Sequence, residues 1–344
     1  MIPSRFRAIT KKYRSLRIAV VGDFCLDRYL EIDPARPERS IETGLPVHNV
    51  LNIRGQPGAA GTVLNNLVAL GIGTVFPVGF RGCDGEGSEL ERALQRLPGV
   101  SLQYFFATQE RRTFTYTKPL VMHRGKPPEE LSRLDIKNWT PTTVAVRKRI
   151  VSAIRALASK VDAMIVLDQV DLPETGVVTR QVLATLKSVS SARPGLPILA
   201  DSRQRLRGFP PLNLKMNAVE LARFIKARQV RGVTRIQELA VALARRNRRA
   251  VFVTLAERGI VGALPSGEVA HVPALPLRGP IDIVGAGDSV TANLTAAVAA
   301  GATLREALEI ASAGASVVIH QLGTTGTASV RQIGQLIGAR ARRS

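Results

Sequence analysis

Residues 282–300 read DIVGAGDSVTANLTAAVAA, a glycine-rich turn followed by a helical run of small residues. Glycines at 285 and 287 leave backbone amides open to an anion, and the helix that follows adds its positive end. Asp288 stands in the first turn, where a carboxylate can accept the proton of a hydroxyl that attacks phosphorus. The same pattern also suits an ordinary helix start with an acidic first turn. The turn therefore predicts phosphate chemistry only when other motifs agree with it.

The rest of the chain alternates short apolar runs with helical patterns. Runs of this length are typical of strands buried on both faces of a parallel sheet, and they occupy 16–22, 74–79, 163–168, 197–201 and 250–254. Between them, 62–70 and 143–159 place apolar residues on one helix face, and Thr303 with Glu306 forms a capping box. This alternation predicts an α/β fold with a doubly wound, mostly parallel sheet flanked by helices.

Two stretches interrupt that alternation. Residues 31–54 are extended and punctuated by proline, and 101–122 contain SLQYFFA and TFTYTKPLVM, which are typical of strands. We expect these stretches to pair into a small accessory sheet. No repeat, linker or low-complexity segment divides the chain. The expected organisation is therefore a basic N-terminal extension (1–15), one domain (16–335) and a basic tail (336–344).

Composition excludes several classes of protein. A chain of 344 residues that is 45% hydrophobic can bury a large core and is neither disordered nor fibrous. No apolar run approaches the roughly 20 residues of a membrane span, and no secretory signal precedes the first strand. Cys25 and Cys83 have no metal-ligand spacing with the four histidines. We therefore expect two buried thiols and a cytoplasmic location.

The charge balance is strongly positive, with 48 Lys and Arg against 27 Asp and Glu and a net charge of +21. Such a field attracts phosphorylated metabolites and other polyanions. The clusters at 5–17, 228–249 and 340–343 have no zinc-finger spacing or aromatic-rich RNA signature beside them, so we favour a solvated basic surface over a nucleic-acid site. The absence of GxxxxGK[ST] excludes a Walker-type kinase. The absence of GxGxxG after the first strand disfavours a Rossmann dehydrogenase.

Four ordered motifs resemble those of the ribokinase-like (PfkB) carbohydrate kinase family, over essentially the whole chain. They are VVGDFCLD at 20–27, PGAAGT at 57–62, NAVE at 217–220 and DIVGAGD at 282–288. Within that family, GDFCLDRY, ETGLPV, RLD at 133–135 and QLGTTG from 321 most resemble the heptose-phosphate kinase branch. The resemblance implies a ribokinase-like fold whose two β excursions form a lid. It also implies ATP- and Mg²⁺-dependent phosphoryl transfer to a sugar or sugar-phosphate hydroxyl, and a homodimer formed through the lid.

The resemblance also implies roles for the residues around the acceptor sugar. Asp288 resembles the catalytic base, and the amides of Gly285, Ala286 and Gly287 resemble the anion hole for the transferring group. The implied substrate contacts are Asp27, Gly58, Ala59, Thr62, Asn66, Lys118, Asp168 and Arg203. Because arginine suits phosphate, we expect Arg203, with Lys118 and Arg112, to hold a substrate phosphate near the mouth of the lid.

Further residues resemble the nucleotide and metal positions of the family. Asn217 and Glu220 resemble the pair that organises Mg²⁺ and the phosphates, mostly through water. Thr254 and Gly259 resemble a segment beside the nucleotide. Asp282 resembles a backbone position of a monovalent-cation site, which K⁺ would occupy.

Several positions depart from the family pattern. Ala59 stands in place of the second glycine of a Gly-Gly pair, Thr62 in place of an asparagine, and Ile283 in place of a threonine. The lysine of the heptose branch is missing from 168–172 (DQVDL), while Arg203 keeps a cation. These departures support an alternative, a catalytically weak sugar- or nucleotide-binding regulator, whereas the intact Asp288 favours a kinase. No HxGH motif of a fused nucleotidylyltransferase occurs.

Overall fold

The computed structural model describes residues 1–203, 206–323 and 325–341, and within them a nine-stranded sheet forms the centre of the molecule. In spatial order its strands are β16 (Val269–Val272), β15 (Ile260–Ala263), β14 (Val251–Thr254), β13 (Asn213–Asn217), β12 (Ile198–Ser202), β11 (Ala163–Asp168), β1 (Arg17–Gly22), β6 (Thr74–Gly82) and β7 (Phe105–Thr108). Neighbours from β14 to β7 pair in parallel, and β15 and β16 pair antiparallel. The predicted mostly parallel sheet is therefore confirmed.

Helices cover both faces of this sheet, which explains the continuous apolar strands. Along β1, Ile18 and Val20 belong to one core, whereas Ala19 and Val21 belong to the other. The first core is shared with α1 (Pro3–Thr10), α2 (Ala60–Ala69), α3 (Gly85–Gln95), α8 (Ala286–Ala299), α9 (Leu304–Val318) and α10 (Val330–Ala341). The second is shared with α4 (Val144–Ala158), α5 (Arg180–Ala192), α6 (Ala218–Phe224) and α7 (Val233–Asn247).

Local signals in the sequence set where these helices begin. The Thr143 side chain caps α4 by accepting from the amide of Val146. The expected capping box of Thr303 and Glu306 opens α9. Within the described ranges, no helix has both the length and the apolar character required to cross a bilayer. Cys25 is buried as expected, but Cys83 is exposed.

The two chain ends are part of the domain, which corrects the expected boundaries. Residues 1–15 form α1 and the 3-10 helix η1 (Lys11–Ser15), with Phe6, Ile9 and Tyr13 buried. Helix α1 packs on α10, in which Ile333 and Ile337 are buried. Apolar residues spaced among the arginines thus fold the basic N-terminus onto the core. Of the expected basic tail, 336–341 belongs to α10, and 342–344 lies outside the described residues.

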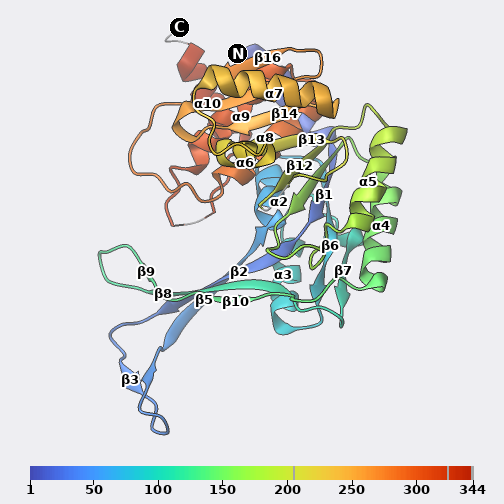
Figure 1. Cartoon of the computed structure of the whole chain (residues 1–344). Helices are drawn as coiled ribbons and strands as arrows, with labels where there is room; N and C mark the ends of the chain where they lie inside the picture. The colour runs from blue at the N-terminus through green and yellow to red at the C-terminus, as the bar shows by residue number, and fades with distance from the viewer. Residues whose placement is uncertain (204–205, 324, 342–344) are drawn as a thin grey trace.

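A second, five-stranded sheet leaves the body as an arm that ends near the β3–β4 hairpin (Figure 1). Its strands are β10 (Leu134–Ile136), β8 (Phe114–Val121), β2 (Phe24–Ile32) and β5 (Val50–Ala59), with β9 (Glu129–Glu130) paired to β8. We call this sheet the lid sheet. The small hairpin pairs β3 (Glu38–Arg39) with β4 (Pro46–Val47).

The lid sheet differs from the expected one in two ways. It begins at Phe24, one residue after β1 ends, rather than at 31. The segment 105–108 is not in it, because β7 pairs with β6 at the edge of the main sheet. Phe105 is buried there and packs edge to face on Phe24, with ring centroids 5.2 Å apart. Aromatic burial therefore draws this strand into the body.

The order of the main strands reverses beside β1. The chain moves from β1 out to β6 and β7, then returns to β11 on the other side of β1. In open α/β sheets, the crevice at such a switch point, beyond the carboxyl ends of the strands, binds ligands. Asp23, Asp27 and Asp168 lie at this point.

Candidate active site

The glycine-rich turn opens α8 without a capping side chain. Gly285, the N-cap, has φ 80° and ψ −6°, and none of the described side chains bonds the first-turn amides. A Cβ on Gly285 would lie 3.0 Å from Thr325 Cγ2, so the turn requires glycine. From Ser289 to Ala297 the helix is buried on every side. The amide of Ala286 donates to Ile283 O at 3.2 Å, whereas none of the described side chains takes the amide of Gly287. The start of α8, on a helix that the core holds in place, is therefore suited to bind an anion.

A buried lysine lies beside these amides. Lys215 Nζ, on β13, donates to Asp201 Oδ2 at 2.7 Å, and Thr291 Oγ1 donates to the same oxygen at 3.1 Å. A Cβ on Gly287 would lie 3.2 Å from Lys215 Nζ, so the ammonium group lies against the turn. We did not predict Lys215 from sequence. The available signal was a lysine inside the apolar run that ends at Asn217.

The electrostatics of Asp288 suit a general base. Burial raises the pKa of Asp288 to about 6, the charge of Lys215 acts against that rise, and Asp201 adds to it. Arg203 and Asp27 also influence this carboxyl, so residues from four separate segments share one site. Burial alone would lower the pKa of Lys215, but the adjacent Asp201 carboxylate holds it above its ordinary value. A base with a pKa near 6 is ionised at neutral pH and still accepts a proton readily.

Asp27 lies on the face of the lid sheet that carries most of its polar side chains. Gln56, Asp27, Tyr116 and Asp135 pair across β5, β2, β8 and β10, so they share one face. Lys118, two residues beyond Tyr116, lies on the same face. Burial raises the pKa of Asp27, while Lys118 and Arg203 oppose that rise. The Asp27 carboxyl therefore lies within the field of two of the expected substrate-binding cations, Lys118 and Arg203.

The turn between β5 and α2 contains two predicted contact residues. A Cβ on Gly58 would collide with the Asp27 carboxylate, so Gly58 lies directly against it. Ala59 has φ 53° and ψ −116°, a conformation that favours glycine. The alanine that replaces the family glycine thus strains the backbone.

Two other predicted substrate contacts, Thr62 and Asn66, are buried in helix α2. Asn66 is fully buried, and its Nδ2 donates to Thr62 O at 3.0 Å. Thr62 is also buried, with its methyl group near Gly285. Burial inside the packed helix keeps Asn66 away from a substrate hydroxyl, so this contact was wrongly expected. Thr62 instead forms part of the support beneath the turn.

The carboxyl end of β11 holds Asp168 close to a second buried carboxyl. Burial, with the charge of Asp23, raises the pKa of Asp168 to about 7, and Ser202 Oγ donates to it at 3.0 Å. Asp23 accepts from the amides of Gln169 at 2.9 Å and Val177 at 2.6 Å. Asp23 therefore ties the end of β1 to the loop after β11.

Of the three predicted phosphate-binding cations, only two lie at the site. The Arg203 side chain is exposed. Burial raises the pKa values of Asp23, Asp27 and Asp288, and the charge of Arg203 opposes that rise. Arg112 instead forms ion pairs with Asp84 and Glu86 at the start of α3, at 3.4 and 3.5 Å. These acidic partners hold Arg112 there, so its expected place at the mouth of the lid was wrong.

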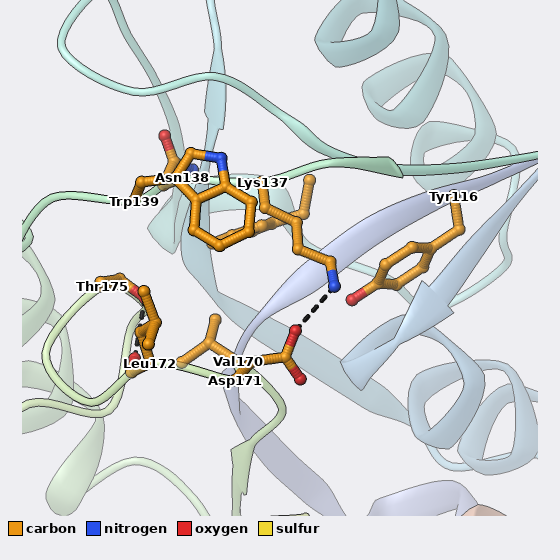
Figure 2. Close-up of a pocket in the computed structure, with 9 residues that line it drawn as sticks. Tyr116, Lys137, Asn138, Trp139, Val170, Asp171, Leu172 and Thr175 are labelled. Atoms are coloured by element: carbon orange, nitrogen blue, oxygen red, sulfur yellow. Dashed lines mark hydrogen bonds and ion pairs between the residues drawn. The ribbon is translucent and has the colours of Figure 1, made fainter. Parts of the chain in front are cut away.

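A pocket lies where the lid sheet meets the loop after β11 (Figure 2). Lys137, just after β10, donates to Asp171 Oδ2 at 2.6 Å, and the Tyr116 ring lies beyond the ammonium group (Figure 2). Trp139, the single tryptophan of the chain, lines the same pocket and is 68% exposed. The Lys137–Asp171 ion pair thus links the lid sheet to the body beside Asp27.

The predicted nucleotide residues lie at the ends of β13 and β14. Asn217 Oδ1 accepts from the Glu220 amide at 2.9 Å and Glu220 Oε2 accepts from the Asn217 amide at 2.7 Å, which together form the capping box of α6. Thr254 pairs with Asn217 across the sheet. Gly259 has φ 93°, and a Cβ there would collide with Val272 O. The positive φ and the lack of room for a side chain therefore require glycine at 259.

The donor set fits a Mg²⁺ ion that arrives with phosphates. In the described part of the chain no three His, Cys, Asp or Glu side chains gather as a ligand shell. Magnesium in such sites keeps several waters and takes one or two carboxylates together with substrate phosphates. Glu220 Oε2 is used by the capping box, which leaves Oε1 for this role.

Comparisons with curated proteins give the family. A family model described as pfkB family carbohydrate kinase matches residues 17–331. The chain is 30% identical over 324 residues to the bifunctional protein HldE of Pelobacter propionicus, covering 92% of this chain and 62% of that protein. For the bifunctional protein HldE of a Bradyrhizobium species the identity is 29% over 316 residues, with coverages of 91% and 61%. The chain thus spans less than two thirds of the length of these relatives.

Solved structures share the architecture. Ribokinase of Arabidopsis thaliana, solved with ribose and ATP, superposes with a TM-score of 0.67 at 19% identity, covering 94% of this chain and 98% of that one. Phosphofructokinase-2 of Escherichia coli, solved with fructose-6-phosphate, gives 0.70 at 17% identity, covering 95% and 100%. At these identities the likeness shows the fold, which is ribokinase-like.

Proposed function

This chain belongs to the pfkB family of carbohydrate kinases, phosphotransferases that act on a sugar hydroxyl, and we propose that the start of α8 is where it transfers the γ-phosphoryl group of ATP. One observation carries the proposal: the uncapped amides of α8 lie beside both Asp288 and the Lys215 ammonium group. A base and a set of fixed donors at one turn, with a cation packed against it, match what phosphoryl transfer requires.

Each residue has a distinct part in the proposed step. Asp288 takes the proton of the sugar hydroxyl as the new O–P bond forms and the bond to the β-phosphate oxygen breaks, releasing ADP. The amides of Gly285, Ala286 and Gly287, with Lys215, hold the negative charge on the phosphoryl oxygens. Asp27 and Asp168 orient the sugar. Mg²⁺, through Glu220, Asn217 and water, would neutralise phosphate charge.

An ADP-release assay across free and phosphorylated sugars, including heptose phosphates, tests this function. Asp288→Asn keeps the shape but cannot accept the proton, so kcat should fall about 10²–10⁴-fold with ATP affinity little changed. Glu238→Gln, which changes an exposed carboxyl on α7 that the proposed site does not use, is the matched control. Wild-type turnover by Asp288→Asn would remove this residue from the mechanism. Sugar and ATP binding by the wild-type chain without any turnover would favour the regulatory alternative.

We further propose that the accepted sugar carries a phosphate, held by Arg203 and Lys118. Both cations influence the Asp27 carboxyl, so a phosphate on a sugar bound by Asp27 lies within their field. The Escherichia coli neighbour holds a sugar phosphate, whereas the Arabidopsis neighbour holds a free sugar. Arg203→Ala should reduce kcat/KM for a sugar phosphate by about tenfold or more, and should reduce it much less for the free sugar. A free sugar preferred over every phosphorylated analogue would contradict this proposal but leave the kinase assignment intact.

Two further proposals complete the assignment. The first is a homodimer formed through the lid sheet, whose face opposite Asp27 exposes apolar side chains such as Ile53 and Leu134.

The second proposal is that K⁺ binds near Asp282, since the Escherichia coli neighbour has also been solved with potassium. Asp282 forms a local turn in which Oδ1 accepts from the Val284 amide at 3.0 Å, close to the start of α8. Turnover in K⁺ compared with tetramethylammonium tests the second proposal.

A further inference from the structure

A pocket of about 280 Å³ opens at the end of the main sheet where its parallel strands begin, opposite the active site. It lies where β14 begins, between the end of α7, the β15–β16 turn and the α8–α9 connection. We propose that this pocket binds an organic anion, a carboxylate or phosphate carried on a compact apolar body. The proposal concerns a second site and does not depend on the catalytic one.

The interior of the pocket is apolar. Phe252, Leu264, Val298, Ala302 and Leu304 all line it, and Phe252 and Leu304 are buried. Pockets with apolar walls and a few polar groups at the rim are typical of small-molecule sites. The body of the ligand is therefore apolar and small.

The charge at the rim is positive. Arg248 and Arg249 line the pocket. Arg249 is held by the carbonyl groups of Ser190 and Pro194, whereas no described residue forms a hydrogen bond or ion pair with the exposed Arg248 guanidinium. The nearby acid Glu306 is already bound by Arg5, at 2.8 Å. An anion at this rim thus meets an available planar cation that can bond carboxylate or phosphate in two places.

Arg248 also has a strained backbone. It is the C-cap of α7, with φ 55° and ψ 26°, a left-handed position where helices usually place glycine or asparagine. Residues in such conformations gather at functional sites, where the strain is retained for a purpose. Here the left-handed cap belongs to the residue that carries the available guanidinium at the rim.

The pocket is remote from the proposed reaction. Asp288 is in the first turn of α8, whereas Val298 lines the pocket at the other end of the helix. Ten residues of helix separate them by about 15 Å. A ligand in the pocket therefore leaves ATP and sugar free to bind.

Titration calorimetry with octanoate and with phenyl phosphate, in saturating ATP and Mg²⁺ but without sugar, tests the site. We expect one binding site for at least one of these anions, and the comparison shows whether carboxylate or phosphate is preferred. Octylamine and octanol, which lack the negative charge, should not bind. Failure of both anions to bind in saturating ATP, or binding that is seen only when ATP is left out, would refute the proposal.

Variants separate this site from a general effect of positive charge. Arg248→Gly should weaken anion binding at least tenfold and also raise the melting temperature of the unliganded protein, because glycine relieves the left-handed cap. Ala302→Phe should fill the pocket and abolish binding. Arg246→Ala is the matched control, since it removes the same charge from the same turn but its guanidinium lies over the Phe224 ring, 5.9 Å from the centroid. Equal weakening by Arg246→Ala and Arg248→Gly would contradict the proposal.

Discussion

Ala59 holds a backbone conformation that favours glycine, φ 53° and ψ −116°, at the turn beside Asp27. A non-glycine residue in such a region costs on the order of 1–3 kcal/mol, part of which glycine would lose again through its freer unfolded chain. We therefore expect Ala59→Gly to stabilise the protein by about 1 kcal/mol, measured by urea unfolding. Ala60→Gly, at the first residue of α2, removes a fully buried methyl group, so it should destabilise the protein and serves as the control. A less stable Ala59→Gly variant would show that the backbone at Ala59 is not strained.

The pKa of Asp288, about 6, predicts the pH dependence of turnover. The base acts when ionised, so kcat/KM should be level above about pH 7 and fall about tenfold per pH unit well below 6. Lys215 opposes the rise of this pKa, so Lys215→Met should move the acid limb to higher pH and reduce activity more at pH 7 than at pH 9. Lys215→Arg, which keeps the charge, should move the limb less. If the acid limb of the pH profile does not move in Lys215→Met, Lys215 does not influence the ionisation of Asp288.

At the scale of elements, the lid sheet has two chemically different faces. Pairing across β2, β5 and β8 places Asp27, Gln56 and Tyr116 on one face and Leu30, Ile53 and Pro119 on the other. Ile53 is 50% exposed, which is costly for an aliphatic side chain on an arm that leaves the body (Figure 1). A partner that covers this face would remove the exposed apolar area from water.

The proposed dimer gives a direct prediction for that face. Ile53→Asp places a charge in the contact of both copies, so the dimer dissociation constant should rise at least about tenfold, measured by light scattering over a concentration series. Val144→Asp is the control, because it adds the same charge at an exposed position on the body, at the start of α4. A monomeric wild-type chain, or an unaffected Ile53→Asp dimer, would exclude this interface.

At the scale of the molecule, the two edges of the main sheet differ in charge. Carboxylates gather at the carboxyl ends of its strands, at Asp23, Asp168 and Asp201. At the opposite end of the strands, Arg17 opens β1 and Arg249 lies two residues before β14, and Asp162 lies directly before β11. The proposed catalytic site therefore combines carboxylates with Lys215 and Arg203, whereas two arginines line the second pocket, within a molecule whose net charge is +21.

The net charge predicts how salt affects turnover. A field of this sign accelerates the encounter with anionic substrates, and salt shortens its range from roughly 14 Å at 0.05 M to about 6 Å at 0.3 M. We expect kcat/KM for a sugar phosphate to fall several-fold over that range at constant K⁺, with kcat unchanged. The value for a free sugar, measured at saturating ATP, is the internal comparison. Equal effects on both sugars would indicate a general salt effect.

Sequence alone determined the features that depend on neighbouring residues. The alternation of buried runs and helical patterns gave the doubly wound sheet, and the capping box at Thr303 marked the start of α9. Gly285 and Gly287, with Asp288, marked the glycine-rich turn that opens α8. Each of these features arises within one turn or one strand, where periodicity and backbone conformation are set by residues close in sequence.

Only the tertiary structure decided which distant side chains meet. Asp201 joins Lys215 and Thr291, which is 90 residues further along the chain, and Asp23 bonds the amide of Val177, 154 residues away. The placement of β7 in the main sheet, the burial of α1 against α10 and the arginine-rimmed pocket are of the same kind. Such contacts follow from strand order, register and side-chain direction, which no local pattern encodes, because they arise only when the whole sheet assembles.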